Sequence, residues 1–256
     1  MAFESALAKI ERAENHIDDL HEAFQAFLKG HPHTINDGVD QSGRLTLSVS
    51  FGGPLPVEFA LIVGDAAHNL KTALDHATWE LVGLDGGPQD RWLQFPFGDT
   101  QSNYESLCGG LKTPRADTNA FFVGLGAYQD GPGKQLYTLN RLDIIDKHKI
   151  LTPLVAACEF HGGIEIVDES GKVVIQLAKD GVVTMHVAPD GTSVSGISVP
   201  QGMQIRRDTS SEPVVDIFFD KVDPIGVRRM IPALTELRDA TAATIANFKA
   251  FVNSRP

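Results

Sequence analysis

Residues 65–79 concentrate the side chains that could do chemistry. On a helix, at about 100° per residue, one side of this segment is apolar and holds Ile62, Ala66, Leu70, Ala73, Leu74, Ala77 and Leu81. The opposite side holds Asp65, His68, Thr72, Asp75, His76 and Trp79. A solvated face usually carries Lys, Glu, Gln and Arg, whereas short polar groups beside a large aromatic favour a face that lines a pocket. Hydrogen bonding to neighbouring helices is the structural alternative for the same side chains.

A second segment, residues 140–149, places two carboxylates on a helix that is apolar nearly all round. Asp143 and Asp146 fall within the arc of Leu136, Leu139 and Ile150. A buried carboxylate is costly unless a cation, a proton donor or a metal meets it, and the candidate partners are Lys71, His68, His76 and Arg141. We therefore expect the helices over 57–82 and 135–149 to be neighbours, with one carboxylate within salt-bridge reach of the polar face. A purely structural ion pair would produce the same pattern.

Histidines beside carboxylates are suited to proton transfer near neutral pH. The leading interpretation is a hydrolase with a pocket between the two helices. In it, His68 and His76 transfer protons, and the orienting carboxylates are Asp75, Asp143 or Asp146. The alternative is a non-enzymatic ligand-binding or protein-interaction module in which the same residues are structural.

A spacing that occurs twice in the sequence also suggests metal-assisted hydrolysis as a possible mechanism. Asp65-x-x-His68 and Asp18-x-x-His21 both present a carboxylate and an imidazole on one helix face. Such pairs on facing helices can hold divalent metals, so these four residues are the candidate metal ligands. A charged helix start or a solvated flank of the first helix is the simpler explanation of Asp18.

The sequence HNLKTALDHATW at residues 68–79 resembles the core HNLRSALDHLAW of a family of uncharacterised bacterial proteins. That family continues with FP, matched here by Phe95-Pro96, and with L..IDKHR, matched by residues 142–149. The similarity covers about the first 150 residues. It supports the choice of segments and implies no activity.

Lys71-x4-His76 also resembles the Arg-x4-His signature of HEPN ribonucleases, which are helical bundles that cleave RNA without a metal. The resemblance implies that His76 is the general base toward a 2′-hydroxyl and that Lys71 stabilises the phosphorane. Lysine in place of arginine loses the bidentate fork. Residues five apart diverge by about 140° on a regular helix, so the pair would need a kink or a second copy of the chain in a homodimer.

The elements expected to position these residues are four long helices, over 3–29, 57–82, 135–149 and 224–252, the last with Asp223-Pro224 at its start. A strand is expected over 44–49, and loops with short helical turns over 88–134. Between 151 and 222, short β-branched runs separated by turn signals indicate an antiparallel meander. The expected fold class is α+β, with the meander (151–222) inserted between a helical portion (1–150) and a C-terminal helix (223–256) that packs back on that portion in one compact unit.

The charge, the cysteines and the apolar segments of the sequence limit which classes of partner are expected. The chain has 22 Lys+Arg against 33 Asp+Glu, a formal net charge of −11, which argues against a broad electrostatic contact with nucleic acid or an anionic membrane. Two cysteines far apart in the chain, Cys108 and Cys158, form neither a disulfide framework nor a zinc-thiolate motif. Without an apolar signal segment or a run of about 18 apolar residues, a cytoplasmic protein with no membrane partner is expected. The substrate, a small molecule or RNA, stays open.

Overall fold

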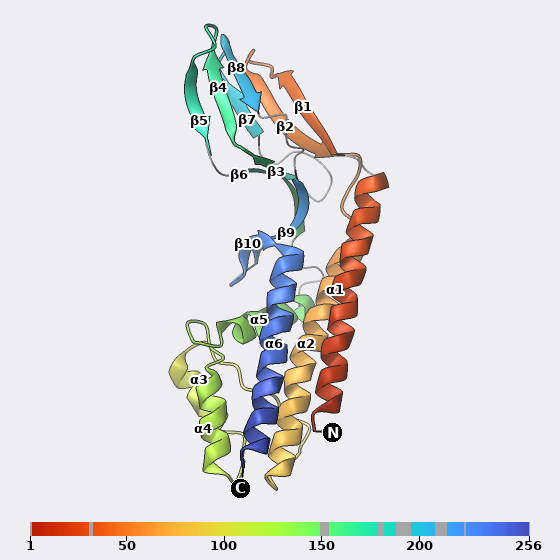
Figure 1. The fold of residues 1–256 in the computed structure, drawn as a ribbon, viewed down its shortest axis with the longest axis vertical. Helices are drawn as coiled ribbons and strands as arrows, with labels where there is room; N and C mark the ends of the chain where they lie inside the picture. Colours follow the sequence, from red (N-terminus) through yellow and green to blue (C-terminus); the bar gives the residue numbers. More distant parts are fainter. Residues whose placement is uncertain are drawn as a thin grey trace. The chain divides into compact units, whose positions relative to one another are not determined.

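The computed structural model of the chain describes residues 2–30, 33–148, 154–178, 182–187, 196–207, 214–222 and 224–255. Helices and strands are both present (Figure 1), so the expected α+β class is confirmed. The chain divides into two compact units. The helical unit comprises Met1–Glu22, Glu58–Thr152 and Lys221–Pro256, and the β unit comprises Ala23–Val57 and Pro153–Asp220. The helical portion expected over 1–150 therefore differs in one respect, because residues 23–57 cluster with the strands.

The four expected helices are present as α1 (Glu4–Gly30), α2 (Val57–Leu84), α5 (Lys134–His148) and α6 (Met230–Asn253). Two further helices, α3 (Gln101–Gly109) and α4 (Ala116–Leu125), occupy the region expected to hold loops and short turns, so the picture of about four helices is incomplete. Local signals explain α3: the Thr100 side chain caps its start, and Tyr104 and Cys108 bury one side of it. The C-cap of α4 is Gly126, with φ +60°, as expected for glycine in this position.

The last helix starts later than expected. It begins at Met230, after strand β10 (Gly226–Arg229), rather than at residue 224. Asp223, the expected N-cap, lies outside the described residues. Two residues after Pro224, Gly226 has φ +73°. A regular α-helix contains no such backbone conformation, so the helix cannot start at residue 224.

Helices α1, α2 and α6 of the helical unit pack along one another (Figure 1). Contacts from α1 to α2 run from Phe3–Glu80 to Lys9–Asn69, so the two helices are antiparallel. Contacts from α1 to α6 run from Phe3–Phe248 to an ion pair of Glu14 with Arg238, which makes this pair antiparallel as well. α2 and α6 are consequently parallel.

An aromatic cluster forms the core of the helical unit. Its rings come from α1, α4, α6 and the loop between α2 and α3: Phe3, Phe95, Phe121, Phe122, Phe248 and Phe251. Phe95, 3% exposed, places its ring centroid 6.1 Å from that of Phe122 and 6.5 Å from that of Phe248. The loop that carries Phe95 is therefore anchored in the core, and this loop reaches the candidate site.

The strands belong to three small sheets, ordered β1-β2-β7, β10-β9-β3-β6 and β5-β4-β8, rather than to one meander. Besides β10, their bounds are β1 (His33–Val39), β2 (Leu45–Phe51), β3 (Leu154–His161), β4 (Ile164–Asp168), β5 (Val173–Leu177), β6 (Val182–Val187), β7 (Gly196–Val199), β8 (Met203–Arg207) and β9 (Val214–Val222). The expected meander is wrong because β3 pairs with β6 and β9, while β4 pairs with β5 and β8. Gly162 and Gly163, at φ +83° and +79°, make the turn at which the chain changes sheet.

No helix among the described residues is both long enough and apolar enough to cross a membrane.

Candidate functional site

The polar and apolar sides of α2 separate as the sequence indicated. The expected apolar side is buried, with Ile62 half-buried and the other six residues fully enclosed. On the polar side, Asp65 and His68 are exposed, and Thr72, Asp75 and His76 are half-buried. Trp79 is 47% exposed, a large apolar side chain left open to solvent. The polar residues form two separate groups rather than one continuous site.

The first group joins α2 to α5, and we call it the open cluster: His68, Asp143, Asp146 and Lys147. His68 Nδ1 lies 2.9 Å from Asp143 Oδ1. Asp143, 2% exposed, also accepts a hydrogen bond from Lys147 Nζ to Oδ2 at 2.6 Å. The prediction that a carboxylate of the 135–149 helix lies within salt-bridge reach of the polar face of α2 is confirmed.

The hydrogen bond to Asp143 fixes how His68 is presented. A neutral imidazole next to a carboxylate carries its proton on the nitrogen that faces it. Nδ1–H then donates to Asp143, and Nε2 is left as an acceptor, with the Thr72 hydroxyl 3.4 Å away. Half of the His68 side chain is exposed, as is 46% of the Lys147 side chain. The buried carboxylate of Asp143 therefore orients an imidazole that solvent can reach.

Asp146 lies one helical turn beyond Asp143, against the backbone of α2. Burial, and then the nearby charges of Asp143 and Asp65, raise the pKa of the Asp146 carboxyl above its usual value. The carboxylate fits there because α2 has Gly64 at the point of contact. A Cβ on Gly64 would lie 2.3 Å from Asp146 Oδ1, well inside van der Waals contact. Glycine at this position makes room for the second carboxyl of the open cluster.

The second group, the closed cluster, consists of Lys71, Asp75, Gln94 and Phe95. Lys71 Nζ donates to Asp75 Oδ2 at 2.6 Å and lies 3.4 Å from Gln94 Oε1. The backbone N–H of Phe95 donates to Asp75 Oδ1 at 3.0 Å. The side chains of Lys71 and Asp75 are 9% and 19% exposed. Both oxygens of Asp75 accept hydrogen bonds from the protein, so this cluster ties the 88–97 loop to α2.

His76 belongs to neither cluster. Its Nδ1 is enclosed and has no hydrogen-bond partner among the described residues. The rest of the residue helps to line a pocket of about 490 Å³, together with Ser5, Asp75, Trp79, Glu80 and Leu93. This pocket lies between α2, the start of α1 and the 88–97 loop.

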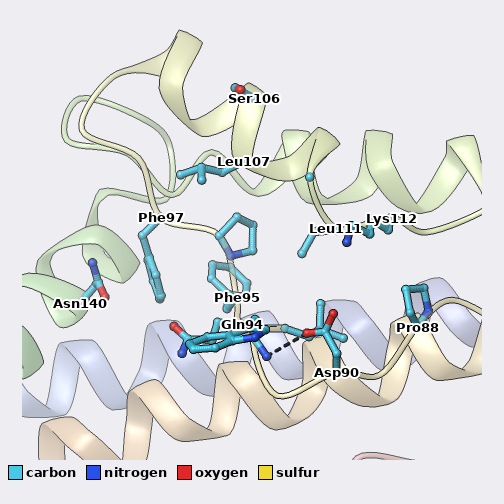
Figure 2. Close-up of a pocket in the computed structure, with 14 residues that line it drawn as sticks. Pro88, Asp90, Gln94, Phe95, Phe97, Ser106, Leu107, Leu111, Lys112 and Asn140 are labelled. Carbon is cyan, nitrogen blue, oxygen red and sulfur yellow. Dashed lines mark hydrogen bonds between the residues drawn. The ribbon is translucent and has the colours of Figure 1, made fainter.

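A second hollow, also of about 490 Å³, lies on the other side of that loop. Figure 2 shows Phe95 and Phe97 between α3 and the long helices, with Pro88 toward one end of the cleft and Asn140 of α5 toward the other. Neither hollow is lined by both α2 and α5. The expected pocket between these helices stays a prediction: the helices contact each other through the open cluster, and both of these hollows are lined in part by the 88–97 loop.

The candidate metal ligands do not come together. Within the described part of the chain, no group of three or more His, Cys, Asp or Glu side chains is arranged to hold a metal ion. Asp18 and His21 are exposed on α1, and Asp65 is exposed on α2. The fourth candidate, His68, has Asp143 as its partner.

Sequence reasoning missed several residues of these groups. Lys147 was detectable, because it lies four residues after Asp143 on the same helix face. The Phe95 backbone N–H and the Gln94 side chain were not, because a loop has no periodicity that predicts which helix it meets. Nothing in the sequence marks Gly64 as important, because its role depends on the Asp146 side chain that the fold brings against it.

Comparison with protein-family models, with curated proteins and with solved structures finds no match to this chain. The resemblances to the bacterial family and to the HEPN signature stay predictions. The second and third motif segments both contact the first. Asp75 accepts a hydrogen bond from the backbone N–H of Phe95, and His68 forms a hydrogen bond with Asp143. Lys149, the last residue of the third motif, lies outside the described residues.

Proposed function

We propose that the helical unit is a hydrolase in which His68, oriented by Asp143, acts first as general base and then as general acid. The observation that carries the proposal is the 2.9 Å hydrogen bond between His68 Nδ1 and the buried Asp143 carboxylate. A base held in one tautomer by a carboxylate, with its second nitrogen toward solvent, is the arrangement that general base catalysis requires.

The reaction proceeds by activation of water. His68 Nε2 takes a proton from a water molecule, and the resulting hydroxide oxygen bonds to the electrophilic carbon of the substrate. Asp143 stabilises the imidazolium that forms. The imidazolium then gives this proton to the leaving oxygen as the bond to the leaving group breaks, which returns His68 to its starting state.

The charges of the site favour an uncharged ester over RNA. The carboxylates of Asp65, Asp143 and Asp146 act on one another beside His68, and among the described residues Lys147 is the lysine that forms an ion pair with Asp143. A phosphodiester would approach against this negative charge. Its main counter-charge in the HEPN-like scheme, Lys71, is buried against Asp75. A small neutral acyl ester meets neither obstacle.

The test is a hydrolysis assay on purified protein with a nitrophenyl acyl ester, bis-nitrophenyl phosphate and a fluorogenic oligoribonucleotide. Ester turnover is expected, and His68→Gln and Asp143→Asn should each lower it by about 100-fold. His21→Gln, an exposed histidine on α1, is the matched control and should leave the rate unchanged. Turnover that is equal in wild type and His68→Gln, or that is absent for all three substrates, would contradict the proposal.

Removal of divalent metals with EDTA distinguishes the proposed mechanism from metal-dependent hydrolysis. The proposal predicts unchanged ester turnover in EDTA, because proton transfer by His68, oriented by Asp143, needs no metal. Activity lost in EDTA and restored by Zn²⁺ or Mn²⁺ would show that a metal generates the nucleophile instead.

A non-enzymatic ligand-binding module is the second candidate. It is favoured by the closed state of the Lys71–Asp75 pair together with the pocket beside it at Trp79. In this function the open cluster is a structural ion pair between α2 and α5, and the pocket at Trp79 binds the ligand.

A further inference from the structure

The pocket at Trp79 combines an aromatic surface with carboxylates. It is lined by Ser5, Asp75, His76, Trp79, Glu80 and Leu93. Its volume of about 490 Å³ lies within the range of small-molecule sites. Aromatic and aliphatic side chains make up half of these residues, and two of the others are acids. Such a surface suits a ligand that is apolar in shape and positive in charge.

The two carboxylates differ in how their charge is balanced. Asp75 has its cation, Lys71, at 2.6 Å. The oxygens of Glu80 both lie 2.9 Å from the backbone nitrogen of Phe3. No lysine, arginine or histidine in the described part of the chain forms an ion pair with Glu80. One negative charge therefore remains in the wall of the pocket, held in position by the start of α1.

Trp79 supplies the second attraction. It lies next to Glu80 in the chain and is 47% exposed, although Leu70 and Leu74 on the same helix are fully buried. An indole ring attracts a cation through the negative potential of its face, and tryptophan does so most strongly of the aromatic side chains. Exposing this ring to water costs free energy that a bound ligand would recover.

We propose that this pocket binds a small organic cation, an alkylated ammonium, with the cationic head between the Trp79 ring and the Glu80 carboxylate. Leu93 and His76 enclose the alkyl groups. A ligand with a phosphate or carboxylate head is excluded by the charge of Glu80. The site lies away from the open cluster and takes no residue from it, so the proposal does not rest on the proposed hydrolase.

The test compares choline with 3,3-dimethylbutan-1-ol, which has the same shape without the charge. Binding is measured by calorimetry on the full chain, and by Trp79 fluorescence in a Trp92→Phe background, which leaves one tryptophan. Choline is expected to bind at least about fivefold more tightly than the neutral alcohol and to change the Trp79 emission. Equal affinities, or no heat from either compound, would overturn the proposal.

Two substitutions locate the site. Glu80→Gln keeps the shape and an acceptor for Phe3 N–H but removes the charge, and Trp79→Leu keeps an apolar surface without the ring. Each should reduce the preference for choline over the alcohol to about one. Glu58→Gln makes the same charge change at an exposed position on α2 and should have no effect. A preference that survives both substitutions, in protein whose circular dichroism shows it folded, would place the cation elsewhere and refute the assignment.

Discussion

Helix α2 carries two carboxylate-centred clusters that use the same chemical groups in opposite ways. In the closed cluster the cation is buried: Lys71 is 9% exposed, and Asp75 receives its second hydrogen bond from a backbone N–H. In the open cluster the carboxylate is buried, while its partners His68 and Lys147 are 50% and 46% exposed. The two ion pairs therefore differ in which partner is exposed, and in the proposed function only the pair with an exposed imidazole takes part in the chemistry.

The largest effect is expected when the closed cluster is broken. Lys71→Met removes the cation and leaves the Asp75 carboxylate with one hydrogen bond in a site with little solvent. The loss in free energy of unfolding should be about 3 kcal/mol, because an unpaired buried charge is costly. Urea denaturation measures it. Lys147→Met, the equivalent change in the open cluster, should cost less than about 1 kcal/mol since its ammonium is half exposed. Equal losses would remove the distinction between the clusters.

A methyl group at Gly64 should disturb the open cluster next. Gly64→Ala places a Cβ where the Asp146 carboxylate now lies, so that side chain must move. We expect a loss of about 1 kcal/mol, in spite of the better helix propensity of alanine. Thermal unfolding of the two proteins provides the measurement. Ala60→Gly, on the same helix, removes helix propensity together with one buried methyl group and gives an upper reference for the propensity term. A more stable Gly64→Ala protein would show that Asp146 does not pack on α2.

The smallest effect is a pH dependence that belongs to Asp146. Its pKa is raised in the folded protein above the ordinary value for an aspartate, so the folded state binds this proton more tightly than the unfolded chain does. Stability from this group is present below the ordinary pKa and is lost as pH rises through the raised one. Relative to Asp146→Asn, wild type should therefore lose less than about 1 kcal/mol between about pH 3 and pH 7, a small value because the side chain is only half-buried and solvent screens its charge. A difference that is flat, or that grows in favour of wild type at neutral pH, would contradict the raised pKa.

A contact could be predicted from the sequence only where its residues recur at the spacing of a helix or strand. The two sides of α2 follow from residue spacing on one helix, and the meeting of α2 with α5 follows from the cost of burying Asp143. The Lys71–Asp75 pair of the closed cluster has the same i,i+4 spacing as Asp143–Lys147, but its link to the loop could not be predicted, since that donor is the backbone of Phe95. Side-chain patterns contain no information about such a donor.

The β unit shows the same limit at larger scale. Most strands could be located from their β-branched runs, but their partners could not, because pairing joins segments far apart in the chain. β1 was missed as a strand since most of its residues are exposed, which leaves no alternating apolar pattern. The Gly162-Gly163 turn was visible in the sequence, yet the change of sheet that it produces was not.

The most direct test of the account is the tautomer of His68, read from the ring ¹⁵N chemical shifts of labelled protein above the titration of imidazole, at about pH 8.5. With Asp143 accepting from Nδ1, the shifts should show Nδ1 protonated and Nε2 free, and Asp143→Asn should shift the ring toward the Nε2–H form that free histidine favours. A wild-type His68 already protonated at Nε2, or one unaffected by Asp143→Asn, would mean that the carboxylate does not orient this imidazole, and the proposed general base would be lost.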